Sequence, residues 1–304
     1  MKEILFLGVT QFLEQHIKYV DINNLYKPIP KILKPIRKIF FDFNLPFKSI
    51  WVNKNLYDDI QSHKTIILSA TQYNQKVSKI IDGYHFKDKR FIFWYWNPVD
   101  KIALPKTISK RWEVWAFDKK DCERYNLYYN NTYYFNEFVQ PALKPALKPV
   151  LNQDIVFVGQ DKDRLVTLIN LSKEFEKYQL SYYFHIVKDQ TSKVKYDYKK
   201  KISYQTILDL IQSSSVLLDI VQEGQTGLTQ RIMEGLFFGK KIITNNKEIV
   251  RYNFYDQKNI FILNVDPIEN LRQFMAESYH PVSRDIINEY TISSWLLNFN
   301  VNNE

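Results

Sequence analysis

The sequence predicts an α/β fold made of two doubly wound domains that face each other across a cleft. Short apolar runs of strand length alternate with segments whose apolar residues recur at helical spacing, the pattern of parallel sheets covered by helices. A length of 304 residues is too great for one small core and fits two domains of roughly 150 residues. A proline-rich segment at 139–153 interrupts the alternation, which then starts again.

In the first half, the apolar runs KEILFLG (2–8) and RFIFWYW (90–96) are short and end at glycine or at Asn-Pro, as strands commonly do. The segment 73–84 instead places Val77, Ile80 and Ile81 on one side of a helix. The expected strands are 2–8, 64–70, 90–96, 112–117 and 132–135, and the expected helices are 11–22, 73–84 and 118–126.

The segment VQPALKPALKPVLNQ (139–153) contains PALK twice in tandem. Proline at this density blocks both a helix and a strand ladder. We interpret the segment as an interdomain linker, with a plain surface loop as the alternative. The strands expected after it are 154–160, 181–187, 216–221, 240–246 and 259–263, and the helices are 163–179, 203–215, 267–278 and 283–299.

These elements predict a first Rossmann-like domain at 1–140, a linker at 141–153 and a second Rossmann-like domain at 154–282. The last helix, within 283–304, is expected to pack back on the first domain.

The composition favours an anionic partner. A net charge of +9 and a pI near 9.2 are compatible with nucleic acid, a phospholipid surface or a phosphorylated small molecule. The single cysteine, Cys122, excludes an internal disulfide and a Cys-based zinc site, and the five histidines have no metal-ligand spacing. We therefore expect neither a metal nor another cofactor. No apolar stretch approaches a membrane span, so a cytoplasmic location is expected, including a peripheral position on the inner face of the cell membrane.

The stretch QEGQTGLTQRIMEGLFFGKK (222–241) contains four of the seven glycines in the chain. Gly224 and Gly227 lie where a strand gives way to a helix, and unpaired N–H groups at a helix N-terminus bind phosphate. Gly235 and Gly239 are interpreted as a close-packing position and a helix stop. The dinucleotide fingerprint GxGxxG and the Walker A motif are absent from this stretch.

The helix in this stretch has an apolar face that includes Leu228, Ile232 and Leu236, while Arg231 and Glu234 lie off it. These two charged residues are three apart and share a face. One interpretation is a surface ion pair of little energetic value. The other is a ligand site, with the arginine on a diphosphate and the glutamate on ribose hydroxyls.

Residues 219–263 resemble the C-terminal half of GT-B glycosyltransferases, above all the small bacterial enzymes of lipopolysaccharide and capsule assembly. Gly227, Arg231, Glu234 and Gly235 correspond to the GxxxRxxEA pattern of the spore-maturation type, with Gly235 in the place of its alanine, and FVGQDKDR (157–164) and FWYWNP (93–98) also fit. The resemblance implies that the second domain binds a nucleotide-sugar, with Glu234 on the ribose and Arg231 and the 224–229 turn on the diphosphate. The implied donor-binding residues are Gly159, Gln160, Arg164, His185, Gly224, Gln225, Thr226, Gly227, Thr229, Arg231 and Glu234.

One departure from the family pattern leaves the stereochemistry open. Many retaining members carry two glutamates separated by seven residues, whereas Glu223 and Glu234 have ten residues between them. In the first domain, Asn97 and Asp100 follow an aromatic strand of the kind that stacks on sugars, and they are the candidate catalytic residues. Asp82 and Asp118 are the other candidate bases, and a structural role is the alternative for each.

Residues 26–48 form a basic amphipathic stretch in which Lys31, Lys34, Arg37 and Lys38 alternate with isoleucine and phenylalanine. Such a stretch is typical of an anionic lipid surface, so these four residues are the candidate membrane or acceptor surface. A solvated helix packed on its own domain is the alternative.

The sequence thus predicts a metal-independent glycosyltransferase of the hexosyltransferase type, which moves a sugar from a nucleotide-sugar, with UDP as the first guess, to a glycan or lipid-linked acceptor of the bacterial cell envelope. The alternatives are a related epimerase acting on the nucleotide-sugar itself and a basic nucleic-acid-binding protein. No known nucleic-acid-binding module is present in the sequence, so nucleic acid is not the expected partner.

Overall fold

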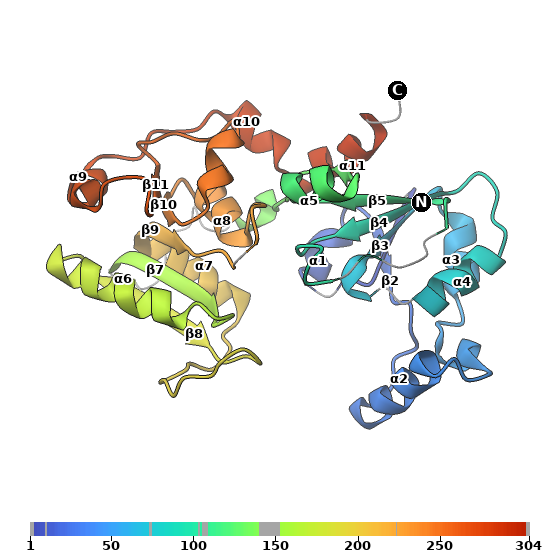
Figure 1. The fold of residues 1–304 in the computed structure, drawn as a ribbon. Coiled ribbons are helices and arrows are strands. Elements are labelled where there is room, and N and C mark those ends of the chain that lie inside the picture. Colours follow the sequence, from blue (N-terminus) through green and yellow to red (C-terminus); the bar gives the residue numbers. More distant parts are fainter. Residues whose placement is uncertain are drawn as a thin grey trace. The chain divides into compact units, whose positions relative to one another are not determined.

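The computed structural model describes residues 3–9, 11–72, 75–102, 104, 109–139, 153–222 and 224–301, with the backbone alone described at 72, 75–77, 300 and 301. The chain divides into two compact units, Met1–Asn130 and Asn131–Glu304. Each unit is built on its own parallel sheet (Figure 1). The predicted α/β fold with two parallel-sheet domains is confirmed.

The first unit contains a six-stranded sheet in the order β2-β1-β3-β4-β5-β6, in which all neighbours are parallel. The strands are β1 (Ile4–Leu7), β2 (Asp21–Asn23), β3 (Thr65–Ser69), β4 (Arg90–Tyr95), β5 (Trp112–Ala116) and β6 (Tyr128–Tyr129). The helices are α1 (Leu13–His16), α2 (Lys34–Asp42), α3 (Leu56–Ser62), α4 (Gln75–Gly83) and α5 (Lys119–Tyr125). The 3-10 turns of this unit are η1 (Lys31–Leu33), η2 (Lys48–Trp51) and η3 (Ala70–Gln72), while η4 (Asn136–Phe138) belongs to the second unit.

Alternate residues of the buried strands serve the two faces of this sheet. Leu5 and Leu7 of β1 join a core cluster with Leu56 and Ile60 of α3. Phe6, which lies between them in β1, meets the ring of His16 edge-on at 5.8 Å on the opposite face. The strands are buried on both sides, which explains why they appear in the sequence as continuous apolar runs.

Two predictions for the first unit were wrong in detail. The expected helix at 11–22 shortens to α1, and the chain then enters β2, which pairs with β1 through Leu5 and Asp21. The strand expected at 132–135 does not join this sheet, whose last strand is the two-residue β6. Both differences arise from pairing partners that are distant in the sequence.

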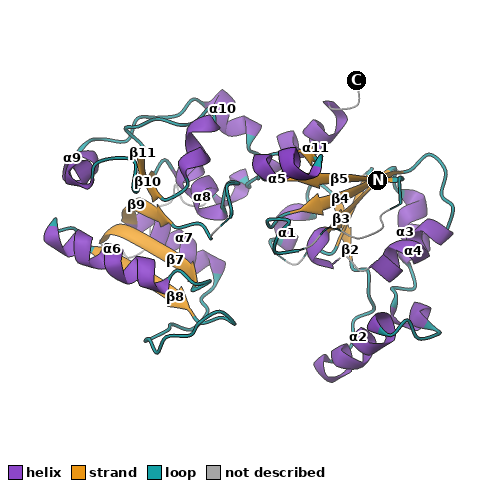
Figure 2. Ribbon diagram, viewed as in Figure 1, coloured by secondary structure: helices purple, strands orange, loops and turns teal. Residues whose placement is uncertain are grey.

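The second unit contains a five-stranded parallel sheet in the order β11-β10-β9-β7-β8. Its strands are β7 (Gln153–Gln160), β8 (Tyr182–Val187), β9 (Ser214–Asp219), β10 (Lys241–Thr244) and β11 (Ile260–Ile262). Its helices are α6 (Leu165–Lys177), α7 (Tyr204–Ser213), α8 (Gln230–Phe238), α9 (Leu271–Ala276), α10 (Arg284–Glu289) and α11 (Ile292–Val301), with 3-10 turns η6 (Lys247–Arg251) and η7 (Ile268–Asn270) (Figure 2).

Helices cover both faces of this second sheet. Leu168 of α6 and Phe274 of α9 share one apolar cluster with Phe157 of β7. On the other face, α8 lies so close to β10 that a Cβ at Gly235 would come within 2.7 Å of Ile242. The second domain is therefore doubly wound, as expected from its alternating pattern.

The aromatic segment around Tyr134 belongs to the second unit. Its backbone N–H donates to the carbonyl of Tyr290 at 2.8 Å, and its carbonyl accepts from Ile292 at 3.1 Å. The segment thus pairs with the junction of α10 and α11, and this pairing divides the single helix expected at 283–299 into two. Tyr133 and Trp295 pack at 4.3 Å between ring centroids and anchor α11 within its own unit.

The predicted linker, 141–153, lies outside the described residues except for Gln153, the first residue of β7. The division of the chain after Asn130 falls before the predicted domain end at 140, because the segment at 132–138 is a structural part of the second unit. The packing of 283–304 against the first domain stays a prediction.

Candidate functional site

The candidate site lies at the carboxyl ends of β7 and β9 in the second unit. The strand order places β7 and β9 side by side, with β8 on one flank and β10 and β11 on the other. The chain therefore turns in opposite directions after β7 and after β9. In open parallel sheets, ligands bind at the carboxyl end of such a switch point.

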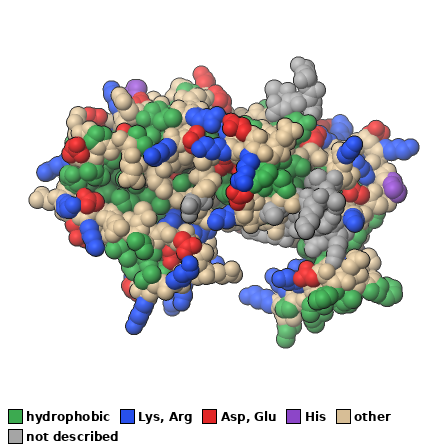
Figure 3. All heavy atoms as spheres, viewed as in Figure 1, with side chains coloured by type: hydrophobic (Ala, Val, Ile, Leu, Met, Phe, Trp, Pro, Cys, Tyr) green, Lys and Arg blue, Asp and Glu red, His purple; other side chains and the backbone are tan. Residues whose placement is uncertain are grey.

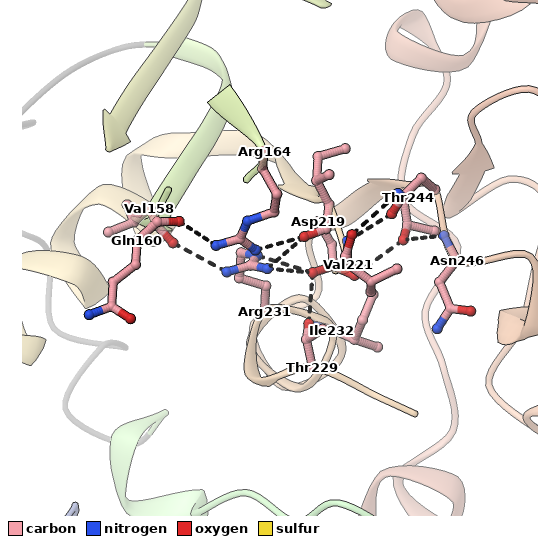
Figure 4. Close-up of polar contacts among 12 residues, drawn as sticks. Val158, Gln160, Arg164, Asp219, Val221, Thr229, Arg231, Ile232, Thr244 and Asn246 are labelled. Atoms are coloured by element: carbon pink, nitrogen blue, oxygen red, sulfur yellow. Dashed lines mark hydrogen bonds and ion pairs between the residues drawn. The ribbon is translucent and has the colours of Figure 1, made fainter. Parts of the chain in front are cut away.

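Asp219, the last residue of β9, is the hub of this edge (Figure 4). Its side chain is fully buried. One carboxylate oxygen accepts from the Thr229 hydroxyl at 2.8 Å and from Arg231 Nε at 3.0 Å, and the other accepts from the Thr244 hydroxyl at 3.2 Å. One carboxylate thus connects the ends of β9 and β10 to the start of α8.

Arg231 extends from the first turn of α8 back over the strand ends. Its guanidinium makes an ion pair with Asp219 at 2.9 Å, and it also lies 3.4 Å from the carbonyls of Val158 and Ile220. Its side chain keeps 17 % of its surface exposed, while the carboxylate beneath it has none. Part of the Arg231 side chain therefore remains accessible at this edge, while Asp219 beneath it is closed off from solvent.

Arg164 lies beside Arg231 and has a structural role in the described contacts. Its three guanidine nitrogens donate to the carbonyls of Gln160, Asp161 and Ile220. Burial, together with the nearby charge of Arg231, lowers the pKa of this guanidinium to about 9. The sequence predicted a donor-assisting role, whereas the structure shows a buried clamp between β7 and β9.

Gly159 allows the two arginines to lie this close together. A Cβ at this position would come within 3.3 Å of both guanidinium groups and within 3.2 Å of the Phe157 ring. Both guanidinium carbons lie over that ring, at 5.2 and 5.0 Å from its centroid. The glycine predicted to lie near a diphosphate therefore lies directly beside Arg231.

The turn before α8 is held in place by hydrogen bonds within the turn and from the segment after β10. Gly224 has φ +82°, a conformation that favours glycine, and Gln225 N–H closes the turn by donating to the carbonyl of Gln222 at 3.1 Å. The side-chain amide of Asn246 donates to the carbonyl of Thr226 at 2.9 Å. The predicted turn therefore exists, and the end of β10 fixes its position.

Thr229 and Gly227 complete the approach to α8. Thr229 is the N-cap of the helix, and its hydroxyl oxygen accepts from the N–H of Ile232 at 3.3 Å. Gly227 is buried. Since Thr229 also donates to Asp219, its hydroxyl is used in forming the helix end and not as an outward donor.

The two glycines predicted to be structural are confirmed as such. Gly235 lies against Ile242 with no room for a side chain, and Gly239 ends α8 in the left-handed conformation at φ +60°.

Glu234 differs from the expected ribose ligand and also from the expected surface ion pair. Its side chain is only 4 % exposed, and its carboxylate accepts from the Tyr204 hydroxyl at 2.9 Å. Burial raises the pKa of this carboxyl to about 7. Glu234 follows Arg231 by three positions on α8 and contacts Tyr204 of α7, whereas Arg231 lies over the strand ends. The two side chains therefore do not converge on one site.

His185 and Gln160 also have positions that differ from a simple ligand role. His185 is buried, with Nδ1 3.0 Å from the Tyr183 hydroxyl and Nε2 2.8 Å from the carbonyl of Lys200. It therefore fixes the chain after β8. Gln160 ends β7 beside the arginine pair and offers its backbone carbonyl to Arg164.

The candidate catalytic residues of the first unit follow β4. Asp100 is exposed, accepts from the Tyr125 hydroxyl at 2.6 Å and pairs with Arg124 at 3.1 Å. The hydrogen bond from Tyr125 lowers the pKa of this carboxyl, which weakens it as a general base. Asn97 is half-buried just beyond the strand.

The other two candidate bases are structural. Asp82 accepts from the indole N–H of Trp112 at 3.1 Å, and Asp118 caps α5 by accepting from Lys120 N–H at 3.0 Å.

Sequence reasoning missed Asp219, Asn246 and Tyr204. Asp219 had a signal, since it is the only charged residue in the apolar run VLLDIV. A carboxylate at the end of a buried strand needs a partner. Asn246 and Tyr204 had none, because their partners lie 20 and 30 residues away. Within the part of the chain that the structure describes, no group of three or more His, Cys, Asp or Glu side chains is arranged to hold a metal ion.

Comparisons with known proteins place the fold. No family model and no curated sequence matches the chain. Sucrose-phosphate synthase from Thermosynechococcus elongatus has a similar structure, with a TM-score of 0.57 over 99% of this chain and 98% of that chain, at 9% identity. The fold is of the GT-B type.

Two further structures resemble the chain more distantly. Anabaena Alr3699/HepE in complex with UDP has a TM-score of 0.48 at 10% identity, over 99% of this chain and 98% of that chain. A protein described as a UDP-N-acetylglucosamine 2-epimerase from Listeria monocytogenes has a TM-score of 0.44 at 8% identity, over 100% and 98%. The similarity to the sucrose-phosphate synthase, at 9% identity, shows the fold alone and not the donor, acceptor or reaction.

Proposed function

We propose that the chain is a glycosyltransferase that takes its sugar from a nucleotide-sugar bound by the second unit. The observation that carries the proposal is the arrangement at the switch point of a GT-B fold. An exposed part of Arg231, a glycine-lined strand end and the turn before α8 lie together there. A helix N-terminus and a guanidinium are both suited to a diphosphate.

We assign the diphosphate to Arg231 and to the turn at 224–229. Asp219 holds Arg231 from the buried side, so the guanidinium can bind an anion from the exposed side without first being reoriented. Glu234 would act indirectly, by fixing α8 against α7 through Tyr204. Which nucleoside is bound is left to experiment, with UDP as the first candidate.

The reaction breaks the bond between the anomeric carbon of the sugar and the diphosphate oxygen, and an acceptor hydroxyl forms the new bond and loses its proton. Negative charge grows on the leaving diphosphate as the bond breaks. Preorganised donors at that position stabilise the transition state more than the ground state. In this proposal Arg231 and the backbone N–H groups of the turn supply that stabilisation.

We further propose a glycan or lipid-linked acceptor of cell-envelope polysaccharide, as in the lipopolysaccharide and capsule enzymes that the sequence resembles. No base is assigned for its hydroxyl. Asn97 and Asp100 remain candidates by position after β4, and the lowered pKa of Asp100 is unfavourable for that role.

The direct test is thermal stabilisation by UDP, GDP, CMP and dTDP. A ligand at 100 times its dissociation constant adds about 2.7 kcal/mol to the free energy of unfolding, which is easily measured. One nucleoside diphosphate should stabilise the chain above the others. If no nucleotide stabilises it, the proposed function fails.

The location of the site is tested by the double variant Arg231→Gln/Asp219→Asn. It removes both charges of the pair, so no buried carboxylate is left without a partner. Loss of one charge-assisted contact should weaken nucleotide binding by about tenfold to a hundredfold. The control is Arg272→Gln, an exposed arginine of α9 in the same unit. Equal affinity in both variants would place the nucleotide elsewhere.

Two outcomes would favour the other functions considered above. Turnover of the nucleotide-sugar to an isomer without any acceptor would favour an epimerase. Affinity for oligonucleotides that falls steeply with salt, without a preference for any nucleoside diphosphate, would favour a nucleic-acid-binding protein.

A further inference from the structure

An unusual surface lies in the first unit, on the segment between β2 and α3. The two ends of this segment are tied together, since Lys27 N–H donates to the carbonyl of Trp51 at 3.0 Å and Asn53 N–H donates to the carbonyl of Leu25 at 2.9 Å. Tyr26 and Val52 also form an antiparallel bridge. The segment therefore leaves and re-enters the unit at one place, where its two ends are hydrogen-bonded to each other.

The inner side of α2 holds this segment in a fixed orientation. Phe41 is buried in the core of the unit and meets the Tyr26 ring edge-on at 5.6 Å. Phe40 packs on Trp51 at 5.4 Å. The Arg37 guanidinium lies 4.1 Å from the centroid of the Tyr26 ring. These contacts determine which side of α2 faces outward.

The outward side is apolar and exposed. Six large apolar residues of η1, α2, η2 and the loop between them, here called the outer apolar face, each have two-fifths or more of their surface exposed. They are Ile32 (80%), Ile36 (43%), Ile39 (49%), Phe43 (73%), Phe47 (76%) and Ile50 (50%). The described chain has fifteen large apolar residues exposed to this extent, so six of the fifteen fall in this one segment.

The spacing places four of these six residues on one stripe. Ile36, Ile39 and Phe43 follow Ile32 at four, seven and eleven positions, which is one side of a helix. Isolated exposed apolar residues need no explanation, whereas a contiguous patch marks an interaction surface.

Positive charge surrounds this stripe. Between residues 26 and 50 there are six lysines and arginines and one acid, Asp42. Lys31, Lys34 and Lys38 are exposed. Figure 3 shows hydrophobic side chains along the outer edge of the α2 segment with lysine and arginine side chains beside them.

We propose that the outer apolar face docks on an anionic lipid bilayer, with α2 lying in the plane of the interface. Apolar side chains enter the boundary between headgroups and acyl chains, and flanking lysines pair with anionic headgroups. Nine residues of helix reach only about 14 Å, less than half of a bilayer core. In the described part of the chain, no helix is long and apolar enough to cross a membrane, so the segment lies on the bilayer.

The charge decides between a bilayer and a second copy of this chain. Two copies meeting through this face would bring two strongly basic segments together, and the like charges would repel. An anionic surface neutralises the same charges. The proposal does not depend on the proposed function, since it rests on the first unit and its experiment measures lipid binding without any nucleotide.

The experiment is co-sedimentation of the full chain with vesicles of phosphatidylcholine alone or mixed with phosphatidylglycerol. The chain should bind the mixed vesicles and bind the neutral ones far more weakly. Lys34→Gln/Lys38→Gln should reduce binding to the mixed vesicles by about thirtyfold. Ile32→Ser/Phe43→Ser/Phe47→Ser should reduce it at least as much, and because these side chains are exposed, the thermal midpoint should stay unchanged.

Matched controls come from exposed residues of the second unit. Val166→Ser/Val265→Ser/Leu297→Ser removes three apolar side chains that are each more than half exposed, and Lys173→Gln/Lys195→Gln removes two exposed charges. Both controls should bind as the unaltered chain does. The proposal is overturned if the unaltered chain does not bind mixed vesicles or if the controls lose as much binding. It is also overturned if light scattering shows a dimer that the triple serine variant abolishes while vesicle binding is unaffected.

Discussion

The carboxyl of Glu234 should make the stability of the second unit fall as pH rises, and Glu234→Gln should remove that effect. The amide has the shape of the carboxylic acid and can still accept from Tyr204. It cannot ionise. The substitution therefore changes the charge of a side chain that is 4 % exposed while keeping its hydrogen bond of 2.9 Å.

The magnitude follows from the pKa. The carboxyl has its ordinary value of 4.5 when unfolded, and burial raises the pKa to about 7 in the folded chain. Between these values the folded chain holds a proton that the unfolded chain has lost, so stability is complete below pH 4.5 and declines as pH rises towards 7. The difference corresponds to about 3 kcal/mol. As pH rises from 4.5 to 8, the free energy of unfolding of Glu234→Gln should therefore rise by this amount relative to that of the wild type.

The assay is urea unfolding of the full chain at several pH values, followed by fluorine NMR of 5-fluorotryptophan. Five of the six tryptophans lie in the first unit, so the signal of Trp295 reports on the second. The control is Glu176→Gln, because Glu176 also accepts from a tyrosine hydroxyl, that of Tyr182 at 2.7 Å, but is exposed. Parallel stability curves for the wild type and Glu234→Gln across this pH range would refute the reasoning.

Three further predictions concern two glycines of the second unit and a buried histidine of the first. Gly235→Ala should lower the free energy of unfolding by about 1–3 kcal/mol, since its Cβ would come within 2.7 Å of Ile242. Gly239→Ala should lower it by about 1 kcal/mol because alanine is strained at φ +60°. Urea titration measures both changes, and an unchanged free energy of unfolding in Gly235→Ala would contradict the packing argument. Burial lowers the pKa of His16 from 6.5 to about 4, so between these pH values the unfolded chain binds a proton that the folded chain does not. The free energy of unfolding of the first unit should therefore fall by about 3 kcal/mol as pH falls through that window. The same acid dependence in His16→Gln would exclude this histidine as its source.

The fold was predictable where the signal is local. The run at 90–96 became β4 almost unchanged, because a strand buried on both faces must be apolar throughout. The strand β2 could not be found, since Asp21–Asn23 is short and polar at both ends and exists only because β1 offers it an edge. Tyr134 is extended as expected, but its partner is the junction after Tyr290, over 150 residues away.

The candidate site was predictable to a similar depth. Glycine content located the turn at 224–229, and helical spacing placed Arg231 off the apolar face. The same spacing suggested Glu234 as the partner of Arg231, because helical periodicity predicts contacts only between residues three or four positions apart. The actual partner, Asp219, lies twelve positions upstream on another element. Only the pairing of β9 with β7 and β10 brings it beneath the guanidinium.

These contacts give α8 a division of labour that its sequence alone does not reveal. Glu234 and Tyr204 fix the helix against α7, and Gly235 allows it to press on Ile242 of β10. The orientation of the helix is therefore determined by groups that lie away from the strand ends. Arg231 is then directed over Asp219 before any ligand arrives, and a group held in place in advance costs less to organise when charge develops nearby. If the second unit binds a nucleotide-sugar as proposed, the buried carboxyl of Glu234 contributes to that binding by fixing α8 and not by contacting the ligand.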